Sequence, residues 1–179
     1  MPTAADLQAA LLTAADLPGG YSAQPVSGSD LGGSSLSGCP ALTSNPTGVS
    51  GQAAVNLTGP GTATSVSESL MQLTAGNAAK AMASYAAMPT SCRSFTGQVD
   101  TYPVAFSTAP LAVAALGDQR TAVRITGYVL ALHVSIYTDV VVVRHGGTLI
   151  VVIDVGLTPE TAFTGQIASK AYANVAARW

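Results

Sequence analysis

Charged side chains are scarce in this chain. Only 9% of the 179 residues are Asp, Glu, Lys or Arg, whereas about a quarter is usual in globular proteins. The seven basic residues are scattered along the sequence, and the formal net charge is −2. A nucleic-acid surface and a polybasic membrane patch both need clustered Lys and Arg. We therefore expect no nucleic-acid partner and no electrostatic attachment to a membrane.

Long hydrophobic runs are also missing. No stretch of about 18 consecutive apolar residues is present, so no transmembrane helix is predicted. Met1 leads directly into PTAADLQAALL, without the basic region and apolar run of a signal peptide. We expect either a cytosolic protein or an exported one whose leader has been removed. The low charge, the Ser-, Gly- and Thr-rich segments and the even number of cysteines favour an extracytoplasmic protein, at the cell surface or secreted.

The chain has only two cysteines, Cys39 and Cys92. In an exported protein they would form a disulfide, and closing a loop of about 50 residues would stabilise the fold by roughly 4 kcal/mol in the chain-entropy model. The alternative is two buried free thiols. The spacing is too wide for a redox pair, and no further cysteine or nearby histidine completes a zinc site. We expect no metal and no cofactor.

Hydrophobic periodicity and turn signals predict a mixed α+β domain. Helices are expected over 3–17, 74–88 and 158–179. Thr13 and Asp16 fit a capping box, and Thr158 and Pro159 are typical of the cap and first position of the last helix. Strands are expected over 52–59, 62–73, 94–107, 120–129 and 132–144, while 109–119 is either a short helix or a loop. The prediction is an antiparallel sheet of about five to six strands with packed helices, the C-terminal helix lying on one face.

The predicted organisation is a single domain in three parts. Residues 1–20 form an N-terminal helical segment, and residues 21–51 form a Gly/Ser-rich loop that the disulfide would tie down. Residues 52–179 form the α+β core.

The stretch DVVVVRHGGTLIVVIDVG, residues 139–156, predicts a β-hairpin. Gly146-Gly147 is a two-residue turn signal, because both positions tolerate positive φ. The turn sets the register: Val142 lies opposite Val151, and Asp139 lies opposite Asp154. Both faces of this hairpin are apolar in the middle, so either helices cover both faces or one face lines a cleft. We expect the helices at 74–88 and 158–179 to cover one face, and the N-terminal helix to cover the other only partly.

The predicted Asp139/Asp154 pair places like charges opposite each other, which is unfavourable. The two carboxylates could share a cation or a proton, or be relieved by Arg120 or Arg124 on a neighbouring strand. The favoured interpretation is that the ladder frays into solvent at this point.

Two further groups of side chains are candidates for chemistry. Arg120, Arg124 and Tyr128 share one strand face and could clamp an anion, or the arginines could simply pair with Asp100 or Asp118. His133, Ser135 and Asp139 share a face in a triad-like order. However, alternate residues on a strand are about 7 Å apart, too far for direct hydrogen bonds. An enzyme is therefore poorly supported, and a hydrolase is the least favoured function.

Several motifs occur together in one order: LLTAADLPGGYSA, a cysteine after a loop, a second cysteine past an Ala-rich helix, LGDQRTAVRITG, VVVVRHGGTLIVVIDVG and a terminal helix. In this the chain resembles secreted lipoproteins of actinobacteria related to the PknH-like extracellular sensor domain. The resemblance covers roughly residues 10–177. It implies an exported, often lipid-anchored domain with an antiparallel sheet, a structural disulfide matching Cys39 with Cys92, and a cleft for an unassigned ligand.

These observations together predict a non-catalytic extracytoplasmic ligand-binding or sensor-like lipoprotein domain. Its ligand would be a small molecule, a lipid or a cell-wall fragment, and a membrane would be met only through an N-terminal anchor outside this chain. The candidate ligand-binding residues are Arg120, Arg124, Tyr128, Asp139 and Asp154. The alternative is a structural or partner-binding protein of the cell envelope.

Overall fold

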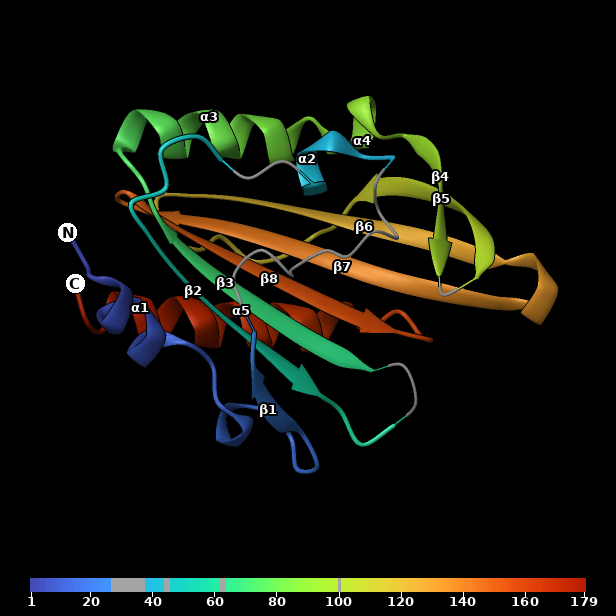
Figure 1. Ribbon diagram of the computed structural model, residues 1–179, viewed down its shortest axis with the longest axis horizontal. Helices are drawn as coiled ribbons and strands as arrows, with labels where there is room; N and C mark the ends of the chain where they lie inside the picture. The colour runs from blue at the N-terminus through green and yellow to red at the C-terminus, as the bar shows by residue number, and fades with distance from the viewer. Residues whose placement is uncertain (27–37, 44–45, 62–63, 100) are drawn as a thin grey trace.

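The computed structural model describes residues 1–26, 38–43, 46–61, 64–99 and 101–179. In these residues the fold is one antiparallel sheet with helices packed against it (Figure 1). The strand order is β1-β2-β3-β8-β7-β6-β5-β4. The strands are β1 (Ser22–Pro25), β2 (Gly51–Thr58), β3 (Ser65–Gln72), β4 (Ser94–Val99), β5 (Tyr102–Pro110), β6 (Gln119–Val129), β7 (Val134–His145) and β8 (Thr148–Gly156).

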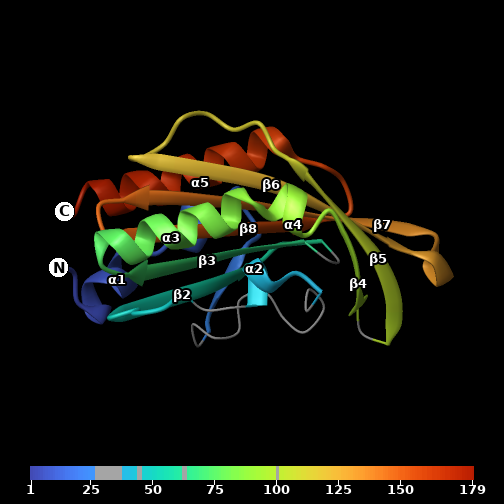
Figure 2. The ribbon, with the colours of Figure 1, turned by 90° about the horizontal axis from the view of Figure 1, so that it is seen from above.

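Helices lie on both sides of this sheet. Figure 1 shows α3 on one side of the sheet and α1 and α5 on the other, and Figure 2 shows the same layers from above. The helical elements are α1 (Ala4–Ala10), η1 (Ala14–Asp16), α2 (Pro40–Thr43), α3 (Ala75–Ala86), α4 (Met88–Ser91), η3 (Leu130–Leu132) and α5 (Thr161–Ala176). No helix among the described residues has the length and apolar character required to cross a bilayer.

The expected sheet of five to six strands is too small, because the structure has eight. The predicted strand 94–107 is two strands, β4 and β5, which pair with each other. The predicted loop 21–51 contains β1, which pairs with β2 at the sheet edge, and the short helix α2. Most of the Gly/Ser-rich part of that segment, residues 27–37, lies outside the described residues. A four-residue edge strand without apolar alternation gives too weak a pattern to be recognised.

The β7–β8 hairpin has the predicted register. Val142 pairs with Val151 and Asp139 pairs with Asp154. Gly146 has φ of 57°, in the left-handed region that favours glycine. Gly147 is required for a different reason, since a Cβ at this position would clash with the backbone carbonyl of Leu73. The two glycines therefore set the turn and allow β3 to continue close beside it.

Each face of the central hairpin is buried under helices. Val141, Val143 and Ile150 pack in one cluster with side chains of α1 and α5, whereas Val140 and Val142 pack in a second cluster with side chains of α3. The expectation that the helices at 74–88 and 158–179 share a face is wrong, because α3 and α5 lie on opposite faces. Hairpin residues alone do not determine on which side each helix returns. The alternative in which helices cover both faces is confirmed.

Helix ends follow the sequence signals only in part. The capping box of Thr13 and Asp16 is present, at η1. The last helix, however, begins at Thr161 with Glu160 at its N-cap, so the predicted cap at Thr158 and first position at Pro159 are wrong. The segment 109–119 is not a helix: β5 continues to Pro110 and irregular chain follows until β6 begins at Gln119.

The predicted disulfide between Cys39 and Cys92 is present. It joins residues 53 positions apart, with a Cα–Cα distance of 5.3 Å. Both cysteines are buried in the core cluster beneath α3. The bond ties the segment before α2 to the end of α4, and so fixes the long connection between β1 and β2 to the body of the domain.

Candidate functional site

The candidate site lies on the α5 face of the sheet, where β7 and β8 carry Asp139 and Asp154 opposite each other. Asp139 is only 3% exposed and Asp154 is half-buried. The favoured sequence interpretation, that the ladder frays into solvent at this pair, is therefore wrong. The ladder continues past the pair to Tyr137 and Gly156, and the start of α5 covers it.

Arg124 on β6 neutralises Asp139. Arg124 and Asp139 pair directly in the β6–β7 register, so the guanidinium lies beside the carboxylate. Its Nε donates to Asp139 Oδ1 and its Nη2 to Oδ2, each at 2.6 Å. This bidentate geometry gives strong charge-assisted hydrogen bonds, and the Asp139 carboxylate raises the pKa of Arg124 further. Of the alternatives left open by the sequence, relief by Arg124 is the one observed.

Two threonines of α5 connect the helix to this charge pair. Arg124 Nη2 also donates to Thr161 Oγ1 at 2.9 Å. The hydroxyl of Thr164 lies 2.8 Å from Asp154 Oδ2 and 3.1 Å from Asp139 Oδ2. Since a hydroxyl carries one proton, Thr164 can donate to only one of the two carboxylates at a time. The first turn of α5 thereby bridges both aspartates.

The two aspartates have different electrostatic environments. Burial, together with the nearby Asp139 and Glu160 charges, raises the pKa of Asp154 to about 6, against the Thr164 hydrogen bond and Arg124, which lower it. Neither Asp154 nor Glu160 has an ion-pair partner within the part of the chain that the structure describes. The site therefore holds one neutralised carboxylate and two that lack a cation.

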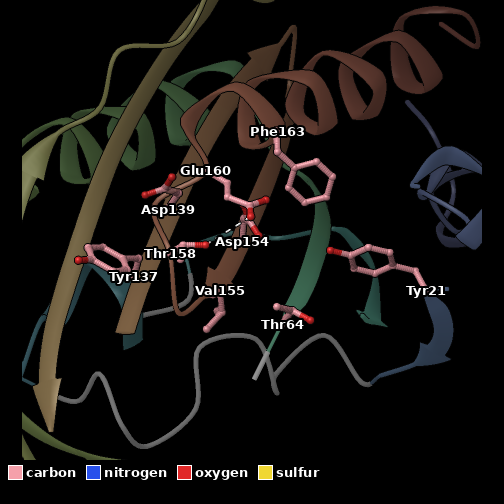
Figure 3. Close-up of a pocket in the computed structure, with 10 residues that line it drawn as sticks. Tyr21, Thr64, Tyr137, Asp139, Asp154, Val155, Thr158, Glu160 and Phe163 are labelled. Carbon is pink, nitrogen blue, oxygen red and sulfur yellow. Dashed lines mark hydrogen bonds between the residues drawn. The ribbon is translucent and has the colours of Figure 1, made fainter. Parts of the chain in front are cut away.

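A small cavity of about 30 Å³ opens beside these carboxyl groups. Figure 3 shows Asp154, Glu160 and the hydroxyl of Tyr21 pointing toward its centre, with Phe163 above and Thr64 and Val155 below. Three aromatic residues contribute to the wall: Tyr21, Tyr137 and Phe163. The rings of Tyr21 and Phe163 lie 6.2 Å apart, and burial together with Asp154 and Glu160 raises the Tyr21 pKa.

This combination suits a small cationic group. Aromatic rings attract cations through their negative faces, and the two unpaired carboxylates supply the opposing charge. The volume admits one group of about the size of a water molecule or an ammonium rather than a whole drug-sized ligand, which occupies about 300 Å³ or more. No set of three or more His, Cys, Asp or Glu side chains in the described residues is arranged to hold a metal ion.

The structure brings together only part of the predicted site. Arg124, Asp139 and Asp154 lie within one hydrogen-bonded cluster, as described above. Arg120 is exposed and donates to the backbone oxygen of Ala114. Tyr128 lies at the far end of β6, with its hydroxyl 3.3 Å from His133 Nδ1. Arg120, Arg124 and Tyr128 therefore do not form a common anion clamp.

The triad-like order on β7 is also not realised. His133 lies before the strand, at the end of η3, with φ of 53° in the left-handed region. Its ring contacts Tyr128 rather than Ser135 or Asp139. The predicted sharing of a strand face thus fails at the histidine, because the strand begins one residue later, at Val134.

Five residues of the site were not recognised in the sequence: Tyr21, Glu160, Thr161, Phe163 and Thr164. No local pattern indicates that the last helix starts above the two aspartates. Tyr21 precedes β1, in a segment predicted to be a loop. Only the strand order, which brings β1 and α5 to the same end of β8, makes these residues neighbours.

We expect Arg124→Met to destabilise the domain by about 2 kcal/mol, because it leaves the buried Asp139 carboxylate without its cation. The loss is smaller than for a fully buried pair, since the Arg124 side chain is 20% exposed. Urea unfolding at pH 7 measures it. Arg120→Met, on the same strand face but exposed, is the matched control and should change stability by less than about 0.5 kcal/mol. Adding Asp139→Asn to Arg124→Met should restore stability; a double variant as unstable as the single one would contradict the pairing.

Other hollows lie among the described residues. One of about 200 Å³ lies between α2 and α3. A wide groove of about 780 Å³ lies near the chain ends and is lined by Asp6, His145, Arg178 and Trp179, among others. The Asp6 carboxylate already accepts from the Thr3 amide and hydroxyl, so the Asp154 cavity is the stronger candidate for specific recognition.

Comparison with solved structures shows that the chain is similar to an extracellular domain. The crystal structure of the extracellular domain of PknH from Mycobacterium tuberculosis superposes with a TM-score of 0.77 at 17% sequence identity, covering 98% of this chain and 97% of that one. At this identity the likeness establishes the fold: this chain has the fold of that extracellular domain over almost its whole length. No protein-family model matches the chain, and no curated protein matches it.

Proposed function

We propose that the protein is a non-catalytic, extracytoplasmic, sensor-like domain that binds a ligand in the Asp154 cavity. The fold of a kinase extracellular domain supports the sensor role. The buried disulfide supports an oxidising compartment. The lipoprotein character and an N-terminal membrane anchor, which the sequence resemblance implies, belong to the same proposal.

The observation that carries the proposal is the pair of carboxylates without a cation, half-buried Asp154 and exposed Glu160, beside a cavity lined by aromatic side chains. We infer that the cavity takes the ammonium group of a small molecule or cell-wall fragment, while the rest of the ligand lies outside toward Thr64 and Val155. Asp154 and Glu160 would provide the charge, and Tyr21 and Phe163 would provide the ring contacts. The neutralised Asp139 would hold the shape of the site through Thr164 rather than bind the ligand directly.

The proposal is tested by NMR titration of the ¹⁵N-labelled domain with matched pairs of probes. At pH 7 we expect n-butylamine and glucosamine to shift the amide signals of Val155, Gly156 and Thr161, and n-butanol and N-acetylglucosamine to leave them unchanged. Because the pKa of Asp154 is about 6, its carboxylate is mostly protonated at pH 5, and amine affinity should be about tenfold weaker there.

The matched control is Asp154→Asn, which retains an oxygen that can accept from Thr164 but cannot carry charge. It should fold normally and lose amine binding at every pH. Equal responses to the amine and the alcohol, or amine binding unaffected by Asp154→Asn, would contradict the proposed site. Shifts centred on the groove near Trp179 instead would move ligand recognition to that groove.

A further inference from the structure

Large apolar side chains gather at the tip of the β6–β7 hairpin. The described residues contain six exposed large hydrophobic side chains, of which Tyr102, Tyr128, Leu130 and Leu132 lie here; the other two are Met1 and Leu157. Leu130 and Leu132 are 69% and 52% exposed. Tyr102 belongs to β5, which contacts η3 directly. We call these four residues the hairpin tip.

The hairpin tip projects from the body of the domain. Figures 1 and 2 show η3 beyond the ends of α3 and α5, at the opposite end of the molecule from both chain termini. The turn has a defined conformation: the His133 amide donates to the Leu130 carbonyl at 3.3 Å, and the Tyr128 hydroxyl contacts the His133 ring. Two leucines are thus held outward on a structured turn, while no described residue packs over them to bury them.

The β6–η3–β7 part of the hairpin tip carries no formal charge. Residues 125–138 contain no Asp, Glu, Lys or Arg, and the acidic residue closest in sequence to Tyr102 is Asp100, whereas the rim of a protein-binding patch is usually polar. The leucines stand at the apex and the two tyrosines lie one step behind them. This order matches the depth profile of a membrane interface, with aliphatic side chains in the acyl region and tyrosines at headgroup level. A convex projection with two leucines at its apex fits a deformable lipid surface better than a rigid protein partner.

We propose that the hairpin tip inserts into the surface of a neutral lipid bilayer. The contact is independent of the Asp154 cavity, and also of any tether at the N-terminus, which lies at the other end of the molecule. Insertion at the tip would set the orientation of the domain on the membrane. Because leucine and tyrosine side chains rather than charged groups would make the contact, it should be insensitive to salt.

The test places an indole at the tip. Trp179 is the single tryptophan, so Trp179→Phe provides a silent background into which Leu130→Trp or, as the matched exposed control, Leu157→Trp is introduced. Each variant is mixed, without a tag, with an excess of phosphatidylcholine vesicles, because a tether at either terminus would hold the tip, at the other end of the molecule, away from the bilayer. Emission wavelength and quenching by shallow doxyl-labelled lipids are measured at 0.1 M and 0.5 M salt.

We expect a blue shift and quenching for Leu130→Trp, unchanged by salt, and neither for Leu157→Trp. In the wild-type background, Leu130→Ser/Leu132→Ser should lower the partition coefficient onto phosphatidylcholine vesicles by about tenfold or more. Emission from Leu130→Trp that stays at its solution wavelength would overturn the proposal, as would equal quenching of both indoles. A response abolished at 0.5 M salt would show electrostatic adsorption and would overturn it as well.

Discussion

Glu68→Gln should remove most of the pH dependence of this domain's stability between pH 6 and 8. Glu68 lies in β3, is fully buried beneath the N-terminal segment, and accepts a hydrogen bond from the Leu12 amide through Oε2. Its Oε1 is buried without a partner in the described residues. Burial raises the pKa of this carboxyl from 4.5 to about 8, against the Leu12 hydrogen bond, which lowers it, and with a small contribution from Asp16, which raises it.

The direction of the effect follows from linkage. The unfolded chain releases the Glu68 proton near pH 4.5, whereas the folded domain retains it until about pH 8. The stabilisation is therefore complete below pH 4.5 and is lost progressively as the pH rises to 8. The total loss is roughly 4 to 5 kcal/mol, of which about 2 kcal/mol falls between pH 6 and 8. Asp154, whose pKa is raised only to about 6, acts with the same sign mainly below pH 6.

Urea unfolding at pH 6, 7 and 8 measures this loss. Glutamine retains an oxygen that can accept from Leu12 but cannot ionise, so Glu68→Gln should show a nearly flat profile over this range. Glu160→Gln, which replaces the other, exposed glutamate, is the control and should keep the wild-type slope. A wild-type profile that is flat between pH 6 and 8 would contradict the burial of an ionisable Glu68.

Removing the disulfide should have the second large effect. Cys39→Ala/Cys92→Ala frees a loop of 53 residues, and the restored entropy of the unfolded chain corresponds to about 4 kcal/mol in the loop-closure model. For a domain of this size the melting temperature should fall by about 8 to 16 °C. Differential scanning calorimetry of the oxidised protein and the double variant gives the value.

The reduced wild-type protein separates the bond from the substitution. The reduced protein, with both thiols free and not alkylated, should have a melting temperature close to that of the double variant, because neither protein has the loop closed by a disulfide. A double variant that melts within about 2 °C of the oxidised protein would show that packing, rather than the bond, holds the α2 segment in place.

Local sequence signals were sufficient to predict those helices and strands whose pattern is contained in a few adjacent residues. The β7–β8 register follows from Gly146-Gly147 and the valines on either side. The strands β2 and β3 and the helix α3 were predicted for the same reason. The disulfide followed from the number of cysteines and the compartment.

The candidate site depended on longer-range information. Asp139 and Asp154 were correctly paired, but their burial depends on β6 lying beside β7 and on α5 starting above them. A sequence pattern does not specify on which face a helix returns, so the Arg124–Asp139 pair and the Thr164 bridge were visible only in the fold. The same limit explains why Tyr21 could not be assigned to the cavity, since it lies 133 residues before Asp154 in the sequence.

The central claim is that Asp154 is an ionisable carboxyl in a cavity made for a cationic group. Carbon-detected NMR of the Asp154 side-chain carboxyl, titrated from pH 3 to 9 with and without saturating n-butylamine, tests it most directly. The account predicts a pKa of about 6 in the free domain and a fall of about one unit or more when the amine is bound, because a neighbouring cation favours the ionised form. An Asp154 pKa that is unchanged by the amine would contradict the account.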